Sequence, residues 1–370
     1  MTRVELASAL TPEQALGWLV SDDRPFALSG DWFGLGGVTI LGSEPVRVGD
    51  PRHDDPFGLI AEANSDSSDA AVGGGWVGWL GYGLGAEIEA LLPPPPPAVP
   101  RPRWSLAFYD HVVIHDGERW FFESLTERPD RLDLWRQRLS TEPPPFPEAE
   151  PPALAPTGSG GSGHIAAVTE LLERIAAGDL YQANLCMRLA GRYSGDPLAL
   201  FADGLSAGRP RFGACVDGVV SLSPERFLRR HGRNVKTEPI KGTRPLTASA
   251  EELAGSAKDA AEHVMIVDLM RNDLGRVCEY GSIFAEPPRV EPHAGVLQLV
   301  STVSGRLRAD VDDGALLRAA FPPGSVTGAP KVAAMEAITE LEAVRREAYT
   351  GAVGIVSPTA GLDLNVAIRT

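Results

Sequence analysis

Residues 259–274 read DAAEHVMIVDLMRNDL, and this mixture of apolar and charged residues predicts a helix. Asp259 and Glu262 lie three positions apart, so a helix places both carboxylates on one face. Such a face can offer two oxygen ligands to one divalent ion such as Mg²⁺. It can equally be a solvated acidic surface, or first-turn acids that interact favourably with the helix dipole. All three interpretations stay open on local sequence alone.

Other helices and several strands surround this segment. Further helices are predicted at 165–177, where apolar residues share one face and Gly178 ends the helix, and at 331–345. Strands are predicted at 104–114, 120–125, 213–221 and 350–357, with Asp116-Gly117 as a hairpin turn. There is no regular strand–helix alternation and no internal repeat, so we expect an α/β class of the α+β type with substantial sheet.

Two proline-rich segments indicate linkers. Residues 93–97 are five consecutive prolines, which predicts an extended surface connection. The segment 141–163 combines a stiff proline-rich half with a flexible Gly/Ser-rich half. We therefore expect an N-terminal region over 1–140, a linker over 141–163 and a catalytic region over 164–370.

Composition restricts the class of protein. The formal net charge is −15, which argues against a general nucleic-acid binder. The three cysteines are widely spaced and form no CxxC pair, so neither a disulfide framework nor a thiolate zinc site is supported. No signal peptide and no membrane-spanning stretch is evident, and a cytoplasmic protein without a membrane role is expected.

Several polar clusters in the second half of the chain suggest chemistry. Lys241 lies in the run PIKGT, where it is either an exposed turn lysine or an active-site amine. Gly324 to Lys331 has the wrong spacing for a phosphate loop, and Pro330 removes a backbone donor. Its Gly-Ser-x-Thr-Gly run can still present hydroxyl and N–H groups to a carboxylate. Arg369 in an apolar strand suggests a buried anionic partner.

Taken together and in this order, these clusters resemble the chorismate-utilising enzymes. The resemblance is carried by EHVMIVDLMRNDLGRVC at 262–278 and FPPGSVTGAPKVAAMEAI at 321–338. It is strong over 165–370 and looser over the first half, through 74–82 and 108–110. It implies two large, mostly antiparallel sheets packed as a sandwich with helices outside.

Two positions are similar to the aminodeoxychorismate synthases within this family. Water-adding relatives carry a lysine base where this chain has Gln182, and glutamine cannot act as a base. Anthranilate synthases carry alanine where this chain has Lys241. The resemblance implies that Lys241 attacks C2 of chorismate before ammonia enters at C4, and that Glu225 protonates the departing C4 hydroxyl. A nucleophilic lysine must be neutral, and a carboxyl acid near pH 7 needs a raised pKa.

The resemblance also implies a Mg²⁺ cofactor held by Glu262, with Asp259 as a second acid. The residues expected to bind substrate are Gln182, Thr243, Ser325, Thr327, Gly328, Tyr349 and Arg369. None of the three cysteines has the glycine setting of a glutaminase nucleophile, so ammonia is expected from a glutamine amidotransferase subunit.

Two departures from the family pattern keep alternatives open. Gln298 replaces a histidine that the family associates with pyruvate elimination, which weakens an anthranilate synthase interpretation. The chain stops at Thr370, before a glycine-rich loop and an acidic helix of its relatives, so a C-terminal truncation is expected. The alternatives are an anthranilate synthase component or another chorismate aminase, and a truncated paralogue without catalysis.

Overall fold

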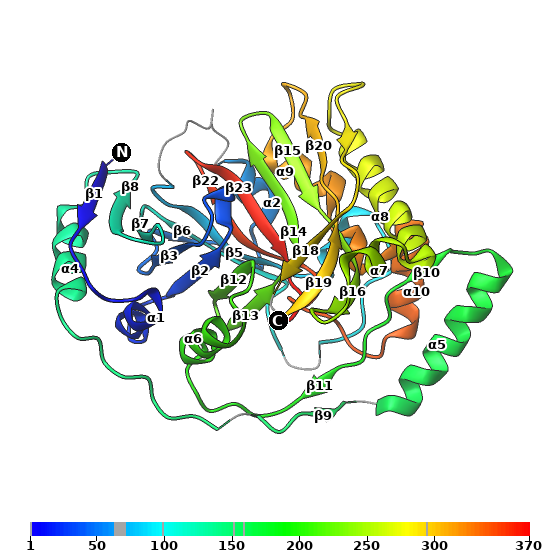
Figure 1. Cartoon of the computed structure of the whole chain (residues 1–370), viewed down its shortest axis with the longest axis horizontal. Coiled ribbons are helices and arrows are strands. Elements are labelled where there is room, and N and C mark those ends of the chain that lie inside the picture. The colour runs from blue at the N-terminus through cyan, green and yellow to red at the C-terminus, as the bar shows by residue number, and fades with distance from the viewer. Residues whose placement is uncertain (1, 63–71, 98–99, 151, 158–159, 294) are drawn as a thin grey trace.

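Two large antiparallel sheets form the body of the protein, with helices on their outer faces (Figure 1). The computed structural model describes residues 2–62, 72–97, 100–150, 152–157, 160–293 and 295–370. The first sheet has the order β1 (Thr2–Leu6), β8 (Trp120–Ser124), β7 (His111–His115), β3 (Val38–Gly42), β2 (Phe26–Gly30), β12 (Phe212–Val216) and β13 (Val219–Ser223). The second has the order β17 (Phe284–Ala285), β20 (Val303–Arg306), β15 (Asn234–Glu238), β14 (Arg226–His231), β23 (Gly361–Val366), β22 (Ala352–Ser357), β5 (Gly75–Leu80), β6 (Trp104–Tyr109) and β4 (Arg47–Val48).

Both sheets contain strands from before and after the expected linker. β12 pairs with β2 in the first sheet, and β22 pairs with β5 in the second. The expected regions 1–140 and 164–370 therefore share both sheets. Their division is one along the chain and does not separate two sheets in space.

The sandwich core lies between the sheets, as alternation along β5 shows. Val77 and Trp79 pack with residues of the first sheet, whereas Trp76 and Leu80 face the opposite side. This is the period of two that a strand buried on both faces requires. Trp32, just after β2, packs edge-on against Phe212 of β12 with ring centroids 5.7 Å apart.

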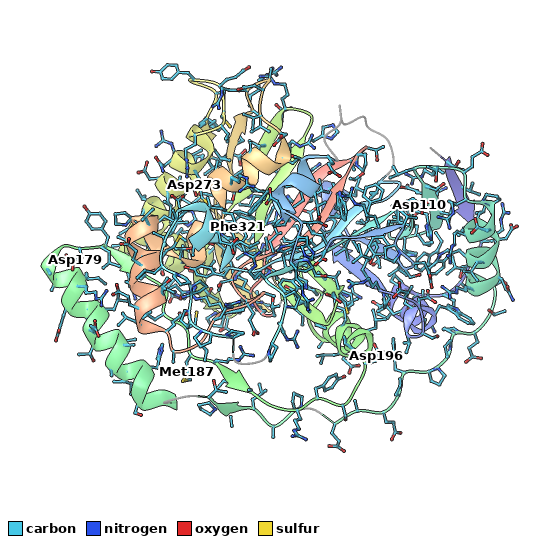
Figure 2. All side chains as sticks on the ribbon, turned by 180° about the vertical axis from the view of Figure 1, so that it is seen from behind. Asp110, Asp179, Met187, Asp196, Asp273 and Phe321 are labelled. Carbon is cyan, nitrogen blue, oxygen red and sulfur yellow. The ribbon has the colours of Figure 1, made fainter. Side chains whose placement is uncertain are left out.

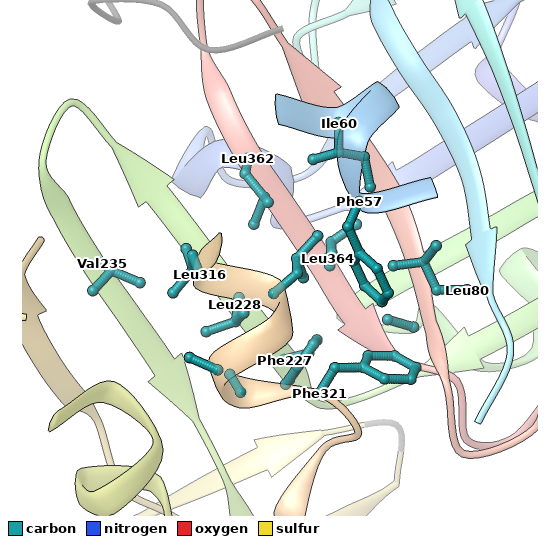
Figure 3. Close-up of a cluster of buried hydrophobic side chains, with 14 of the residues drawn as sticks. Phe57, Ile60, Leu80, Phe227, Leu228, Val235, Leu316, Phe321, Leu362 and Leu364 are labelled. Carbon is teal, nitrogen blue, oxygen red and sulfur yellow. The ribbon is translucent and has the colours of Figure 1, made fainter. Parts of the chain in front are cut away.

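Helices cover the outer face of each sheet. α1 (Pro12–Ala15), α4 (Pro129–Leu139) and α6 (Pro197–Gly208) cover the first sheet, and α2 (Pro56–Ala61), α8 (Ala257–Gly275) and α9 (Asp313–Ala320) cover the second. Figure 3 shows this second layer, in which Leu316 of α9 and Phe57 of α2 pack onto Leu228 and Leu364. The expected sandwich with helices outside is confirmed.

Local predictions held where capping signals were clear. The helix predicted at 259–274 is α8, and the Ser256 side chain caps its first turn by accepting from the Asp259 N–H at 3.3 Å. The helix predicted at 165–177 is α5 (Gly160–Ala177), followed by Gly178 with φ 89°. The helix predicted at 331–345 is shorter and becomes α10 (Lys331–Leu341), because Glu342 is already extended.

Two predicted strands are each a pair of strands. The segment 104–114 divides into β6 and β7 at Asp110, and 213–221 divides into β12 and β13. The second break is a turn at Asp217 and Gly218, with φ of 45° and 73°. A short polar turn within an apolar run was therefore overlooked.

The expected linker 141–163 follows the edge of the molecule between α4 and α5 (Figure 1). It contains the short β9 (Ala155–Pro156), which pairs with β11 (Leu189–Ala190), and the first residues of α5. Positions 151 and 158–159 lie outside the described residues. In the described ranges, no helix combines the length and apolarity needed to cross a membrane.

Candidate active site

Lys241 lies on a strand rather than in an exposed turn. β16 (Ile240–Pro245) forms one edge of a three-stranded sheet with β19 (Val296–Val300) and β18 (Arg289–His293). The Lys241 side chain is half-buried, and its Nζ donates a hydrogen bond to the backbone carbonyl of Ser325 at 2.9 Å. The amine is thus held at a defined point, as a nucleophile requires.

Gly242 lets β16 lie close against α8. Its φ is 75°, and the pairing with β19 is irregular between Lys241 and Thr243. A Cβ at this position would lie 2.9 Å from Leu253 Cδ1 and 3.2 Å from Asp259 Cβ. The contact and the positive φ both favour glycine here. The bulge therefore changes the direction of β16 beside Lys241.

Glu225 is a buried acid next to Lys241. It lies between β13 and β14 and is 4% exposed. Its main chain is fixed, because its N–H donates to Ser223 Oγ at 3.2 Å and its carbonyl accepts from Val366 N–H at 3.0 Å. Burial raises the pKa of the Glu225 carboxyl to about 7, although Ser325, the Lys241 charge and the Ile240 N–H favour the ionised form. A carboxyl of this kind can donate a proton near neutral pH.

Ser325 connects the amine and the acid. It is 8% exposed and lies in the short 3₁₀ helix η3 (Gly324–Val326), between α9 and α10. Its backbone carbonyl accepts the hydrogen bond from Lys241 Nζ, and its side chain favours the ionised form of the Glu225 carboxyl. The expected role of Ser325 was substrate binding, but the described contacts are with the two catalytic candidates.

Three further residues predicted to bind substrate, Thr327, Gly328 and Gln182, lie in the segment that follows Ser325 or on the strand paired with it. Thr327 is fully buried, and its hydroxyl donates to the Pro323 carbonyl at 2.8 Å, so it ties the loop to itself. Gly328 lies on β21 (Gly328–Ala329), which pairs with β10 (Gln182–Ala183). A Cβ on Gly328 would lie 2.2 Å from the Gln182 carbonyl oxygen. The Gln182 Oε1 atom is buried and has no hydrogen-bond partner among the described residues, which leaves it available for a ligand.

Comparison with known proteins assigns this arrangement to a family. The family model "chorismate binding enzyme" matches residues 46–370. The chain is 36% identical over 359 residues to aminodeoxychorismate synthase component 1 of Escherichia coli K12, covering 90% of this chain and 78% of that protein. It is 34% identical over 377 residues to anthranilate synthase component 1 of Streptomyces coelicolor, covering 91% and 73%.

The chain belongs to the chorismate binding enzymes. Among solved structures, anthranilate synthase component I from Streptococcus pneumoniae TIGR4 superimposes with a TM-score of 0.73 at 24% identity, covering 100% of this chain and 83% of that one. The menaquinone-specific isochorismate synthase of Escherichia coli gives 0.71 at 18% identity, covering 100% and 84%. These two likenesses confirm the fold of the chorismate binding enzymes.

The two carboxylates expected to bind metal in this chorismate binding enzyme have different surroundings. Asp259 is buried and accepts from Arg244 at 2.7 Å; hydrogen bonds from Ser256 and then Arg244 hold its pKa below the usual range. Glu262 is half-exposed, and Lys258 Nζ lies 4.0 Å from its carboxylate. The described residues contain no group of three or more His, Cys, Asp or Glu placed to hold a metal. Mg²⁺ often takes one or two carboxylates and fills its other positions with water and substrate oxygens, so Glu262 fits such an ion and the paired Asp259 does not.

Three expected substrate-binding residues lie apart from this cluster. Thr243 is exposed on β16, and Tyr349 is 39% exposed beside a cavity of about 510 Å³ whose lining includes Cys186 and Arg346 but neither Lys241 nor Glu225. Arg369 is exposed, lies beyond the end of β23 with φ 53°, and has no ion pair within the described residues. The anionic partner expected for Arg369 stays a prediction.

Two buried polar residues near Lys241 had no expected ligand role. His263 on α8 is 2% exposed; its Nε2 lies 2.7 Å from Ser301 Oγ, and its Nδ1 has no partner in the described part of the chain. Burial, and then the Lys241 charge, lower the pKa of His263. Gln298 on β19 is also buried, and its Oε1 is likewise without a described partner. The sequence feature that could have identified His263 as a site residue is its position next to Glu262 in the helix motif.

Proposed function

We propose that this chain is the chorismate-aminating component of an aminodeoxychorismate synthase. The observation that supports this most directly is the fixed Lys241 amine beside Glu225, a buried acid whose pKa is raised to about 7. The relatives at 36–39% identity that are named aminodeoxychorismate synthase component 1 point the same way. The product is 4-amino-4-deoxychorismate, a precursor of p-aminobenzoate and folate.

The proposed reaction uses two displacements. Neutral Lys241 forms a bond from Nζ to C2 of chorismate, the two ring double bonds move from C1=C2 and C5=C6 to C1=C6 and C4=C5, and the C4–oxygen bond breaks. Glu225 donates its proton to the departing C4 hydroxyl, which leaves as water. Ammonia then bonds to C4, the two double bonds shift back, and the C2–Nζ bond breaks to release neutral Lys241. The new C4 ammonium loses one proton, which returns to Glu225. The enolpyruvyl group stays on the ring throughout.

Mg²⁺ is part of this proposal, with Glu262 as the protein ligand. When bound, such an ion neutralises the ring carboxylate of the substrate. The ion pair of Asp259 with Arg244 gives that carboxylate a different task in our proposal, namely to hold β16 against α8. Gln182, with its unpartnered Oε1, is proposed to bind a polar group of the substrate.

A partner subunit is also proposed. The relatives are named as component 1, which indicates a second component. We propose a glutamine amidotransferase that supplies ammonia. The chain with chorismate, Mg²⁺ and ammonium chloride should then form product without the partner, whereas glutamine should replace ammonium only when the partner is present.

A second candidate function is anthranilate synthesis, favoured by the relative at 34% identity over 91% of this chain. Product analysis separates the two functions. Incubation with chorismate, Mg²⁺ and ammonium should yield 4-amino-4-deoxychorismate, and pyruvate should be released only after a lyase is added. Release of anthranilate and pyruvate by the chain alone would falsify the proposed function.

A further inference from the structure

Lysine is rare in this chain, and its positions are informative. It occurs four times, at 236, 241, 258 and 331, against thirty arginines. Arginine therefore fills almost every basic position, so a lysine whose ammonium lies at a defined, buried set of acceptors stands out as a site that a compact ammonium suits better. Lys241 is one such site. Lys331 is another, and its side chain is 8% exposed.

Lys331 is fully engaged by buried acceptors. Its Nζ donates to Asp273 Oδ2 at 2.6 Å, to the Ala320 carbonyl at 2.8 Å and to the Pro322 carbonyl at 3.0 Å. An ammonium has three donors, so each has one acceptor. The forked guanidinium of arginine presents its donors in a plane and does not match three convergent acceptors. The ammonium thus joins α8, which carries Asp273, to the loop that leads to Ser325.

Helix stability does not explain this lysine. Lys331 is the first residue of α10, where the positive end of the helix dipole disfavours a cation. Burying a charged pair also brings little net stability, since desolvation offsets most of the attraction. A role in positioning the loop that precedes α10 accounts both for a cation at the start of this helix and for the buried ion pair with Asp273.

Packing of the same loop supports this role. Phe321 sits between the Phe57 and Phe227 rings, with centroids 6.3 Å and 6.1 Å away (Figure 3). A Cβ on Gly324 would lie 2.4 Å from Met270 Cε, so α8 also touches the loop directly beside Ser325. Figure 2 labels Asp273, on α8, and Phe321, in the loop that leads to Ser325.

We propose that Lys331 is a positioning residue for Lys241 and Glu225, acting through the loop from Ala320 to Ser325. The ammonium fixes the Ala320 and Pro322 carbonyls, and Ser325 follows three residues after Pro322. Ser325 in turn accepts the hydrogen bond from the Lys241 amine, and its side chain contacts the Glu225 carboxyl. This inference rests on the proposed function for the roles of those two residues, but its geometry does not.

The test replaces the pair with apolar residues of similar size. The double variant Lys331→Met/Asp273→Leu should fold, because buried ion pairs are often replaceable in this way. The kcat for chorismate consumption with Mg²⁺ and ammonium should fall by about 100-fold, which is the scale of a 1 Å misplacement of a catalytic group. KM should change little. The alkaline limb of the kcat profile should move to lower pH, because a looser loop admits water to Glu225.

The matched control is a second buried pair in the same layer. Arg230→Met/Asp313→Leu removes an ion pair between β14 and α9, with both side chains at most 3% exposed. It should keep the kcat and pH profile of the original chain. Wild-type kcat and pH profile in Lys331→Met/Asp273→Leu would overturn the proposal, as would equal losses in both double variants. If the first double variant does not fold, Lys331→Arg decides: it should lower kcat, and an unchanged kcat would overturn the proposal.

Labelling of Lys241 separates this proposal from the proposed function. With so few lysines, the rate of modification by trinitrobenzenesulfonate can be followed at Lys241 by peptide mass spectrometry. That rate should change in Lys331→Met/Asp273→Leu and stay constant in the Arg230/Asp313 control. A chain that does not consume chorismate defeats the proposed function alone, because the labelling comparison still decides whether Lys331 positions Lys241.

Discussion

The Lys241 ammonium donates to the backbone carbonyl of Ser325 over 2.9 Å. The acceptor is a carbonyl with no proton to exchange, so the bond fixes Nζ in either charge state of the lysine. A neutral amine can keep this bond with one N–H and still present its lone pair to a substrate. A carboxylate in the same place would have favoured the charged form instead. The contact therefore suits a nucleophile better than a structural ion pair.

The first prediction concerns Lys241 itself. Lys241→Ala should lower kcat/KM for chorismate amination by about 10³-fold or more, because loss of a covalent nucleophile is felt on this scale. Lys236→Ala is the control, since Lys236 lies on β15 and pairs only with Glu238 at 3.1 Å among the described residues. Trapping and mass spectrometry should find a substrate adduct on Lys241 in the original chain. Full amination activity in Lys241→Ala would remove the covalent role.

The second prediction is a decline of kcat in alkaline solution. Burial raises the pKa of Glu225 to about 7, and only the protonated form can donate to the leaving hydroxyl. The fraction of Glu225 that can donate a proton is therefore high below pH 7 and decreases as pH rises through that value. Measurement of kcat between pH 6 and 9 at saturating chorismate should show this limb. Glu225→Gln should lower kcat by about 10²- to 10⁴-fold and abolish the limb.

The third prediction is that the same substitution stabilises the fold. The folded-state pKa of Glu225 lies above its ordinary value of 4.5, so the folded chain binds this proton more tightly than the unfolded chain. Stability is therefore lost as pH rises from about 4.5 to about 7, by up to about 3 kcal/mol. Glu225→Gln removes this loss. Urea unfolding at pH 8 should show a higher midpoint for the variant, and little difference at pH 4.5.

The helix at 259–274 was predictable from sequence, and the surroundings of the proposed catalytic pair, Lys241 and Glu225, were not. α8 has a capping serine and helical spacing, which are local signals. Lys241 and Glu225 were found through motifs. Lys241 and Glu225 are connected through Ser325, which lies 84 residues beyond Lys241 in the chain. No local sequence pattern predicts a contact between such distant residues. The ion pair of Asp259 with Arg244 was missed for the same reason.

The interleaving of the sheets was also hidden from sequence. The segment 141–163 differs in composition from its surroundings, but β12 and β13, which follow it in the chain, complete the first sheet. Strand pairing between distant segments leaves no periodic signal within either strand.

The fourth prediction separates the two acids of α8. Glu262→Gln should raise the Mg²⁺ concentration needed for half-maximal activity by at least about tenfold, because a carboxylate ligand is lost. Asp259→Asn should leave the Mg²⁺ requirement nearly unchanged and instead lower thermal stability, since Arg244 loses its partner. Activity titrations with Mg²⁺ and melting curves measure the two effects. Equal Mg²⁺ shifts in both variants would show that Asp259 is also a ligand.

The fifth prediction concerns Arg226, the residue that follows Glu225. It is 1% exposed and donates to Asp363 at 3.1 Å, to Glu238 at 2.7 Å and to the Asp31 carbonyl at 2.6 Å. These contacts join three strands of the second sheet to the end of β2 in the first. Arg226→Met should cost about 3–5 kcal/mol, because it leaves the buried Asp363 carboxylate without its ion-pair partner. Urea unfolding at pH 7.5 measures this loss.

A change of pH distinguishes this mechanism from simple loss of packing. Burial raises the pKa of Asp363 even with Arg226 present, and removal of the cation raises that pKa further. In Arg226→Met the unpaired Asp363 carboxylate can therefore take up a proton in mild acid, so the deficit in stability should shrink between pH 8 and pH 5. Arg271→Ala is the control, because Arg271 forms an exposed pair with Asp268 at 3.5 Å and should change stability by less than about 0.5 kcal/mol. A deficit that is the same at both pH values would mean that the Arg226 side chain acts through its packing on Phe212 rather than through its charge.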